Sequence, residues 1–344
     1  MKVGFVANVI KKNNSGLSTY ASNLYQSIQK FGDVTEIIWG EDTKFNKLFG
    51  TYTNTLKAKP DVIHFPVYWI TDLAALLLPL KAKKVLTIHD LHPLYIQTQG
   101  FVEWTATVKM AMKAADAIIA VSEYTKQDII RTGIKENKIH VIYEAANDNI
   151  WKTNLPKQPY ILSVSSIVPR KNFGTLIKAF WRFKKFTHLD YHLVIVGDTG
   201  GADCRTIEEY NRLCTLVKYY DLQKDVTFTG AIDYPSLNKY YNSASLFVYP
   251  SFYEGFGLPI LEAMRCGCPV IASERTSMPE LVGGAGYTFN PNDSTQLSEI
   301  MANILTNAET MKSLSERSIA QEKKFSWDRA AKETWAVYEG VCNK

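Results

Sequence analysis

Short runs of β-branched and apolar residues alternate with longer amphipathic stretches from one end of the chain to the other. These runs span 3–8, 35–40, 61–66, 84–90, 117–122, 139–144, 160–166, 192–198, 226–231, 245–251 and 269–273. Between them lie stretches such as 16–32, GLSTYASNLYQSIQKFG, whose apolar residues recur at helical spacing. Such alternation predicts βα units and parallel sheets.

The alternation pauses once, in the middle of the chain. Residues 147–159, NDNIWKTNLPKQP, are polar and carry two prolines, as an interdomain linker does. We therefore expect two doubly wound α/β domains that face one another, over 1–150 and 151–326, with a ligand cleft at the carboxyl ends of their strands. The aromatic, amphipathic segment at about 327–344 is expected to pack as a helix on its own domain or on the first one.

The composition narrows the class of protein. A hydrophobic content of 46% and a charged content of 21% are ordinary for a soluble globular protein. The longest apolar run, at 73–80, falls short of the ~18 residues that span a bilayer. A net charge of +5 is too small for a nucleic-acid binder, but it leaves room for a weak peripheral contact with anionic lipid. The first residues read directly into a strand without a signal peptide, so we expect a cytoplasmic protein, at most at the inner face of the membrane.

The stretch 250–273, PSFYEGFGLPILEAMRCGCPVIAS, combines a strand end, a glycine-rich loop and a helix. Pro259 suits the first helical turn, and Gly267 suits the position just after the helix. This arrangement aims free N–H groups and the positive end of the helix dipole at an anion. Glu254 in the loop and Glu262, predicted to lie in the first helical turn, could accept hydrogen bonds from ligand hydroxyls. Alternatively, Glu262 only complements the helix dipole and Glu254 only caps the loop.

Two other loops follow predicted strands. In VPRKN, 168–172, Arg170 and Lys171 stand where a strand ends, which suits them to neutralise phosphates; a solvated basic loop is the alternative. In NNSGLSTY, 13–20, Gly16 begins a helix, and an ordinary turn capped by Ser15 is the alternative.

A family resemblance rests on these motifs. The segment 228–273 closely resembles the nucleotide-sugar-binding half of the family 4 retaining glycosyltransferases, which have the GT-B fold. Its two glutamates, with seven residues between them, match that family's E-x7-E signature. IVPRKN is similar to the family's phosphate-binding loop, in the form frequent among bacterial mannosyltransferases of polysaccharide assembly. KVLTIHDLHPL and AIIAVSEYTKQDI resemble the acceptor-side domain, so the likeness covers nearly the whole chain.

The resemblance implies roles for the residues of the second domain. Glu262 would bond the ribose hydroxyls, and Glu254 would contact hydroxyls of the donor sugar. Backbone N–H groups of the glycine-rich loop would hold the sugar and the diphosphate; this loop comprises Gly255, Phe256, Gly257 and Leu258. Arg170 and Lys171 would stabilise the charge that grows on the leaving nucleoside diphosphate, which is electrostatic catalysis.

In the first domain the resemblance points to two residues. Gly16 would let the backbone approach the diphosphate, and His89 matches the histidine that lies over the donor sugar in the family. A histidine that ends a buried strand can also be a core residue, and that alternative stays open. In the second domain, Ser166 stands where many members carry an arginine; more of the phosphate charge then falls to Arg170 and Lys171, while Ser166 keeps a hydroxyl to donate.

The reaction implied is transfer of a hexose from a nucleoside-diphosphate sugar to an acceptor hydroxyl, with retention of the anomeric configuration. No residue suggests itself as a nucleophile, so we expect departure and attack on the same face of the sugar. The VPRKN form favours GDP-mannose as donor, with UDP-hexoses next. The expected acceptor is a growing glycan, free or lipid-linked.

No metal or other cofactor is expected. The sequence contains no Asp-x-Asp pair, and its five cysteines lack metal-ligand spacing. GDTGG at 197–201 is not G-x-G-x-x-G, so it does not predict a dinucleotide site. Two other functions stay open: a nucleotide-sugar epimerase of similar two-domain fold, which would need an acid–base set, and a non-catalytic nucleotide-sugar binding protein, which would not call for Arg170 and Lys171 beside two glutamates.

Overall fold

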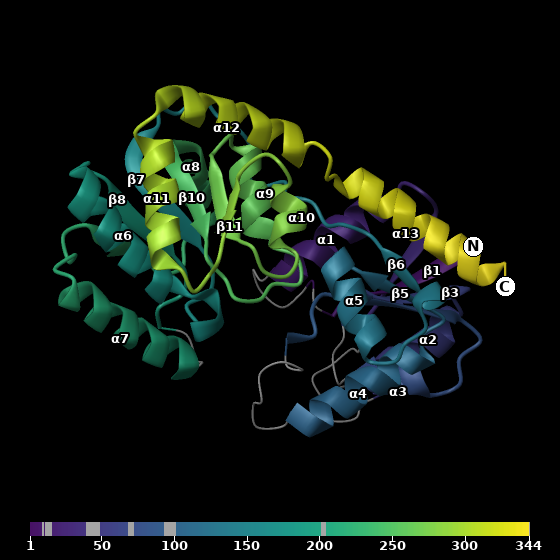
Figure 1. The fold of residues 1–344 in the computed structure, drawn as a ribbon. Coiled ribbons are helices and arrows are strands. Elements are labelled where there is room, and N and C mark those ends of the chain that lie inside the picture. Colours follow the sequence, from purple (N-terminus) through teal and green to yellow (C-terminus); the bar gives the residue numbers. More distant parts are fainter. Residues whose placement is uncertain are drawn as a thin grey trace. The chain divides into compact units, whose positions relative to one another are not determined.

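The structure, a computed structural model, describes residues 1–8, 10, 16–38, 49–67, 72–92, 101–200 and 204–343 (Figure 1). The chain divides into two compact units, one formed by Met1–Ala145 with Phe325–Lys344 and the other by Ala146–Lys324. Each unit contains a six-stranded sheet in which all paired neighbours are parallel. The predicted class, two doubly wound parallel α/β sheets, is therefore confirmed.

The sheet of the first unit has the strand order β2-β1-β3-β4-β5-β6. Its strands are β1 (Lys2–Val6), β2 (Asp33–Ile37), β3 (Val62–Phe65), β4 (Lys83–Ile88), β5 (Ala117–Ala120) and β6 (Ile139–Val141). Its helices are α1 (Gly16–Ile28), α2 (Thr51–Ala58), α3 (Leu73–Leu77), α4 (Phe101–Ala114), α5 (Glu123–Arg131) and α13 (Trp327–Cys342).

Side chains alternate between the two faces of this sheet, because successive residues of a strand point in opposite directions. Ile63 and Phe65 enter the main hydrophobic cluster on the face covered by α3 and α4. His64 and Thr87 point to the other face, which α1 and α13 cover. The last helix of the chain is therefore a layer of the first unit.

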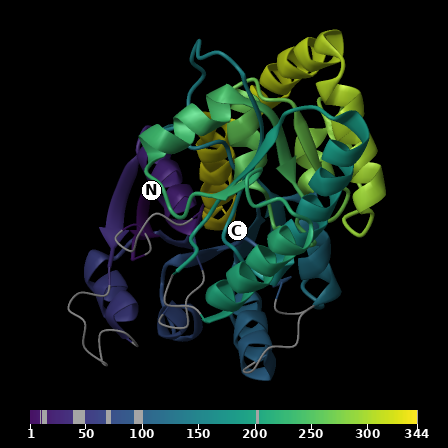
Figure 2. The same cartoon turned by 90° about the vertical axis from the view of Figure 1, so that its left-hand side faces the viewer.

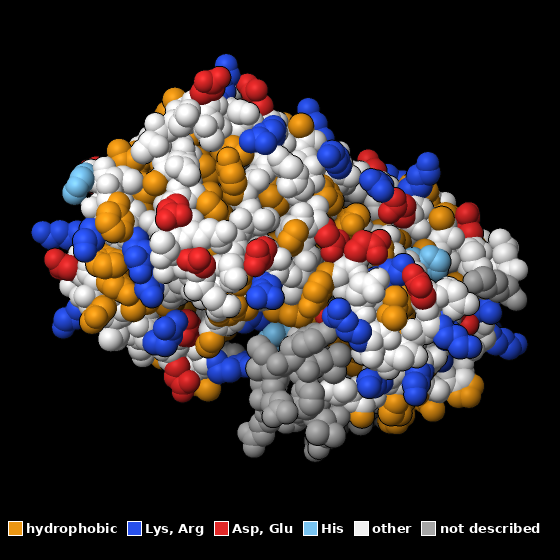
Figure 3. All heavy atoms as spheres, in the orientation of Figure 1, with side chains coloured by type: hydrophobic (Ala, Val, Ile, Leu, Met, Phe, Trp, Pro, Cys, Tyr) orange, Lys and Arg blue, Asp and Glu red, His pale blue; other side chains and the backbone are white. Residues whose placement is uncertain are grey.

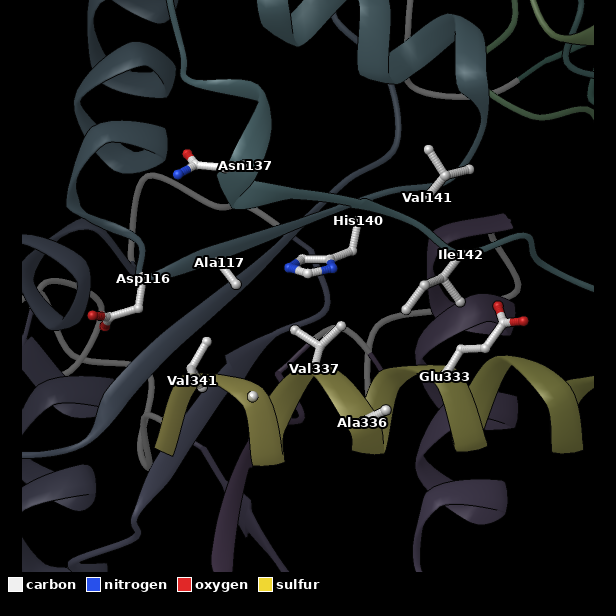
Figure 4. Close-up of a pocket in the computed structure, with 11 residues that line it drawn as sticks. Asp116, Ala117, Asn137, His140, Val141, Ile142, Glu333, Ala336, Val337 and Val341 are labelled. Atoms are coloured by element: carbon white, nitrogen blue, oxygen red, sulfur yellow. The ribbon is translucent and has the colours of Figure 1, made fainter. Parts of the chain in front are cut away.

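A cavity of about 340 Å³ remains between α13 and the edge strand β6. Figure 4 shows Val337 on α13 pointing toward β6 and His140, with Ala117 and Ile142 nearby. Most of its lining is apolar, and none of the predicted site residues lines it. The predicted active-site residues therefore lie elsewhere.

The sheet of the second unit has the strand order β12-β11-β10-β7-β8-β9. Its strands are β7 (Gln158–Val164), β8 (His192–Val196), β9 (Val226–Phe228), β10 (Ala244–Tyr249), β11 (Val270–Ser273) and β12 (Tyr287–Phe289). Its helices are α6 (Phe173–Thr187), α7 (Cys204–Tyr219), α8 (Tyr234–Ser243), α9 (Leu258–Arg265), α10 (Met278–Val282), α11 (Ser294–Leu305) and α12 (Ala308–Glu322). Helices cover both faces of this sheet (Figures 1 and 2).

Polar side chains set the starts of several helices. The residues before α5, α8, α11, α12 and α13 each accept a hydrogen bond from a backbone N–H of the first turn; they are Ser122, Asp233, Asp293, Asn307 and Ser326. Such caps satisfy N–H groups that have no partner inside the helix. No helix of the described residues is long and apolar enough to cross a membrane.

Candidate active site

Three charged side chains meet at the carboxyl end of the second sheet, and we call them the charge cluster: Arg170, Lys171 and Glu254. Lys171 Nζ lies 2.6 Å from Glu254 Oε1, and Arg170 Nη1 lies 3.1 Å from Glu254 Oε2. Arg170 also donates to the carbonyl of Tyr253, and Lys171 donates to the hydroxyl of Tyr249. The side chains of Lys171 and Glu254 are 8% and 10% exposed, so the cluster is largely removed from water.

The loops that carry the charge cluster follow the two central strands, β7 and β10. The strand order reverses between these neighbours, and open parallel sheets bind ligands outside the carboxyl ends of strands at such a point. The backbone N–H of Phe252 donates to the carbonyl of Arg170. The side-chain amide of Asn172 donates to the carbonyls of Pro250 and Pro291. The bonds of Phe252 and Pro250 join two loops that are about 80 residues apart in the sequence, and the bond of Pro291 ties in a third segment.

The cluster holds Glu254 in its charged form. Burial alone raises the pKa of this carboxyl, but the charges of Lys171 and Arg170 and the hydrogen bond from Lys171 outweigh burial and lower it. Two cations against one carboxylate leave a net charge of +1. One positive charge of the cluster is therefore left to pair with the anion of a ligand. The alternative that Glu254 only caps its own loop does not fit these contacts.

Glu262 lies on α9 and has a different environment. The prediction that it lies in the first helical turn is wrong: α9 begins at Leu258, so Glu262 is its fifth residue. Because the dipole effect is confined to the first turn, dipole complementation does not account for this acid. Its Oε2 accepts a hydrogen bond from the hydroxyl of Tyr241, 2.8 Å away, whereas no described residue bonds its Oε1. Burial raises the pKa of Glu262; Tyr241 and the charge of Arg265 offset part of that rise.

The start of α9 offers backbone donors. Pro259 lies in the first turn, as predicted, and Gly267 follows the helix with φ 65°. Gly257 precedes the helix with φ 118° and ψ 50°, a conformation that favours glycine. Within the described residues, neither the N–H of Gly257 nor that of Leu258 has an acceptor. Both groups are free to bind an anion or a hydroxyl oxygen.

Replacing Gly257 by alanine should destabilise the second unit by about 1–3 kcal/mol, because a residue with a Cβ is strained at this φ. The added Cβ would also lie 3.3 Å from side-chain carbons of Ile260 and Leu281. Urea unfolding measures the loss. Gly200→Ala is the matched control, since nothing lies within 4 Å of its Cβ position. Equal midpoints for the two variants would contradict the prediction.

The remaining predicted residues of the second unit lie in the same two loops. Ser166 is exposed, and its carbonyl accepts the N–H of Val168. Gly255 and Phe256 are buried, and the carbonyl of Phe256 accepts a hydrogen bond from the Ser277 hydroxyl. Gly197, the first glycine of GDTGG, packs against this region, because a Cβ there would stand 2.0 Å from the carbonyl oxygen of Ser165.

In the first unit, His89 follows β4 and both of its ring nitrogens have partners. Nε2 lies 2.8 Å from the carbonyl oxygen of Pro66, and Nδ1 lies 2.9 Å from Glu144 Oε1. A carbonyl and a carboxylate only accept hydrogen bonds, so these contacts favour the doubly protonated ring. Burial lowers the pKa of His89, but the hydrogen bond and charge of Glu144, together with Pro66 and Asp90, raise it above its ordinary value. His89 is thus partly buried and paired with Glu144, which favours its charged form.

A buried polar chain lies next to His89. The ring of Tyr20 stands edge-on to His89 with centroids 4.5 Å apart, and its hydroxyl lies 3.1 Å from Thr87 Oγ1. Thr87 also contacts His64 Nε2, and His64 Nδ1 lies 2.6 Å from the hydroxyl of Tyr338 on α13. Burial lowers the pKa of His64 to about 3, so this histidine is neutral. Helix α13 is therefore connected through side chains to the aromatic ring that packs on His89.

Replacing Glu144 by glutamine should lower the pKa of His89, because burial then acts with less opposition. NMR titration of ¹⁵N-labelled histidine measures this shift, and Glu136→Gln, an exposed acid of the same unit, is the control. The pairing also makes stability depend on pH. The pKa of His89 is higher in the folded protein than in the unfolded chain, so His89 stabilises the fold at pH values below its unfolded pKa. This stabilisation is lost as the pH rises through the folded pKa. The Glu144→Gln protein should lack this alkaline loss. An unchanged His89 titration would refute the pairing.

Gly16 is the first residue of α1 and is exposed; residues 13–15, including Ser15, lie outside the described residues. A hollow of about 170 Å³ opens beside it, lined by Leu17, Val67, His89 and Asp90 among others. Sequence reasoning had left Glu144 unassigned and had not singled out Tyr241 or Tyr249. An acid at the end of the predicted strand 139–144 was a usable signal for Glu144, whereas no spacing marked the two tyrosines.

Two successive parallel α/β units of this kind define the GT-B class of fold, which solved structures share. Sucrose-phosphate synthase from Thermosynechococcus elongatus superimposes with a TM-score of 0.84 at 21% identity, with 99% of each chain covered. Anabaena HepE in complex with UDP and glucose superimposes with a TM-score of 0.78 at 18% identity, with 100% of each chain covered.

The chain belongs to the group 1 glycosyl transferases. Residues 146–321 match the family described as "Glycosyl transferases group 1", and residues 40–149 match "Glycosyltransferase Family 4". The family predicted from the motifs is therefore confirmed. Membership in this family favours sugar transfer over the two alternatives, a nucleotide-sugar epimerase and a non-catalytic nucleotide-sugar binding protein.

Several named mannosyltransferases are similar to this chain. The serotype-specific mannosyltransferase WbdA of Escherichia coli is 33% identical over 270 residues, which cover 72% of this chain but 32% of that protein. This chain thus spans about a third of the length of WbdA. O-antigen chain mannosyltransferase B of Escherichia coli is 31% identical over 75% of this chain and 70% of that protein. O-antigen chain mannosyltransferase RfbU of Salmonella typhimurium is 27% identical over 85% of this chain and 88% of that protein.

Proposed function

We propose that the protein transfers a hexose, with mannose favoured, from a nucleoside-diphosphate sugar to a hydroxyl of a growing glycan, free or lipid-linked. The observation that supports this most is the charge cluster, which keeps a net charge of +1 in a site that is largely removed from water. A diphosphate is the anion that best fits a bidentate guanidinium beside an ammonium group. The named mannosyltransferases among the relatives support mannose as the sugar.

Each residue has a defined part in this proposal. Arg170 and Lys171 bind the leaving diphosphate and stabilise its growing charge, while Glu254 shifts from these cations toward hydroxyls of the sugar. The free N–H groups at the start of α9 bind the diphosphate or the sugar. Glu262 accepts a hydrogen bond from the ribose through its free Oε1. In the first unit, His89 contacts the sugar and Gly16 allows close approach of the backbone.

The reaction proceeds with retention and without a metal in this proposal. Departure of the diphosphate and attack of the acceptor take place on the same face of the sugar, and the leaving phosphate accepts the acceptor's proton. The cations and helix N–H groups then supply the charge stabilisation that a divalent ion supplies elsewhere. GDP-mannose is the first donor to test and UDP-hexoses are the next, since HepE binds UDP and glucose in its solved structure.

Thermal-shift measurements with GDP, UDP, ADP and their sugars test the donor, since a ligand that binds only the folded state raises the melting temperature with its concentration. GDP and GDP-mannose should stabilise the protein most. Glu262→Ala should weaken nucleotide binding roughly tenfold to 100-fold, because it removes a charged hydrogen-bond acceptor. Glu299→Ala, an exposed acid on α11, should leave binding unchanged. If no nucleotide stabilised the protein, the proposed donor site would be wrong.

A further inference from the structure

Helix α6 of the second unit presents a cationic and aromatic face to solvent. The helix carries four basic residues and no acid. Its buried stripe holds Leu176, Phe180 and Phe183 among others and packs into the core, so the opposite stripe faces outward. The outward stripe comprises the exposed Lys178, Lys185 and Phe186 and the half-buried Trp181 and Arg182. Figure 3 shows Lys and Arg side chains around hydrophobic ones on the side of the molecule that α6 occupies in Figure 1.

The last residues of α7 extend this surface. Tyr220, just beyond α7, stacks on Trp181 with ring centroids 4.9 Å apart, and Tyr219 stands edge-on to Tyr220 at 5.1 Å. Phe186 is 71% exposed and Tyr219 is 79% exposed, more than the other large hydrophobic side chains of the described residues. Covering aromatic side chains as exposed as these is favourable, because it removes apolar surface from water.

The cations of this face are not neutralised by the protein. Within the part of the chain that the structure describes, Lys178, Arg182 and Lys185 form no ion pair with a carboxylate. Two of them contact a ring instead: Lys185 Nζ lies 5.2 Å from the centre of the Trp181 ring, and the Arg182 guanidinium lies 6.0 Å from it. The nearby acids Asp190 and Asp225 pair with Lys184, which lies on the inner side of the helix.

We propose that this surface, named the α6 face and formed by Lys178, Trp181, Arg182, Lys185, Phe186 and Tyr219, docks on an anionic lipid membrane. Lysine and arginine are attracted to a negatively charged lipid surface, and Trp, Tyr and Phe side chains settle at the level of the headgroups. The α6 face supplies both on one side of one unit, with the aromatic rings between the cations. Charge complementarity thus selects an anionic bilayer.

Other occupants fit this face less well. A carbohydrate platform needs the open face of a ring, but Trp181 has Tyr220 stacked on it and Lys185 over it. A second copy of the chain would bring the same three cations against one another, and like charges oppose such pairing. The docking role is independent of the donor and of the transfer reaction.

Co-sedimentation with vesicles tests the proposal. The full chain is mixed with phosphatidylcholine vesicles or with 7:3 phosphatidylcholine–phosphatidylglycerol vesicles, in 50 mM and 500 mM NaCl. We expect binding to the anionic vesicles at low salt and its loss at high salt, because added salt screens surface charge. The triple variant Lys178→Ala, Arg182→Ala and Lys185→Ala should bind on the order of 100-fold more weakly. Phe186→Ser with Tyr219→Ser should bind about tenfold more weakly even though it keeps every charge.

A matched control separates this face from general electrostatic attraction. Lys57, Lys59 and Lys81 are exposed in the first unit near Leu56 and Leu77, which are 46% and 39% exposed. Their triple replacement by alanine removes the same charge and should change binding less than threefold. An equal loss in this control, equal binding to neutral vesicles, or no binding at all would overturn the proposal. So would sedimentation of the wild type as a dimer that the α6 variants convert to a monomer.

The variants also distinguish docking from transfer. Lys178, Lys185, Phe186 and Tyr219 are exposed and Arg182 is partly exposed, so thermal unfolding should change little, and transfer to a water-soluble acceptor without vesicles should match the wild type. A transfer defect with normal vesicle binding would assign the α6 face to the reaction and would overturn the docking proposal.

Discussion

Lys171→Met is expected to reduce sugar transfer by about 10²–10³-fold, which is the cost of removing one preorganised charge from a developing anion. Burial and fixed partners make the charge of Lys171 effective. Its side chain is 8% exposed, and the Glu254 carboxylate and the Tyr249 hydroxyl fix its ammonium group. A charge fixed in a site without water needs no reorganisation as the leaving group departs. The rate constant with saturating donor and acceptor measures the effect.

Two further variants test whether the loss is due to the charge at position 171. Lys171→Arg keeps the charge and should recover part of the rate, although a guanidinium does not reproduce the geometry of an ammonium group. Lys184→Met removes a lysine of the same unit that pairs with Asp225 at a 23% exposed position, and it should transfer within twofold of the wild type. Transfer by Lys171→Met within fivefold of the wild type, with the donor bound, would contradict the assigned role.

Glu254→Gln is expected to destabilise the second unit by about 3–5 kcal/mol, because it leaves Lys171 and Arg170 in a buried site without their carboxylate. Since separate units can open separately, hydrogen exchange of β7 and β10 peptides in urea measures the loss in the unit concerned. Asp225→Asn breaks the more exposed pair with Lys184 and should cost about 1 kcal/mol or less. Equal losses in the two variants would show that burial does not govern this cluster.

The same variant has an expected pH dependence. The cations lower the folded pKa of Glu254, so its stabilising contribution is present above the unfolded pKa and is lost as pH falls through the folded one. The wild type should therefore lose stability on the acid side more steeply than Glu254→Gln. Parallel acid limbs for the two proteins would mean that the carboxylate is not held in its charged form.

The sequence predicted the parallel sheets well, because β-branched runs and helical spacing are local signals. It missed β12, since Tyr287–Phe289 is only three residues long and half exposed. It placed Pro259 and Gly267 correctly from their backbone preferences. Its error at Glu262 arose from the start of α9, since helix ends are the least certain part of such a prediction.

The residues of the candidate site could be predicted from the sequence, but the contacts between them could not. Arg170, Lys171 and Glu254 were each singled out, yet nothing local indicates that two cations would bind one carboxylate across about 80 residues of sequence. The Glu144–His89 pair is of the same kind, because it joins the ends of two strands that the sheet separates by β5. Side chains that are far apart in the sequence become partners because of the order of the strands in the sheet. The spacing of apolar residues does not indicate that order.

Because α13 belongs to the first unit, this unit can complete its fold only after the whole second unit has been synthesised. A ribosome makes residues 146–324, the whole of the second unit, before it makes the helix that covers His64 and Thr87. Domains commonly complete their folding from the N-terminus onward, but here the unit that starts first finishes last. Until then the nascent first unit lacks the helix that packs on His64, so that face of its sheet is covered only in part, by α1.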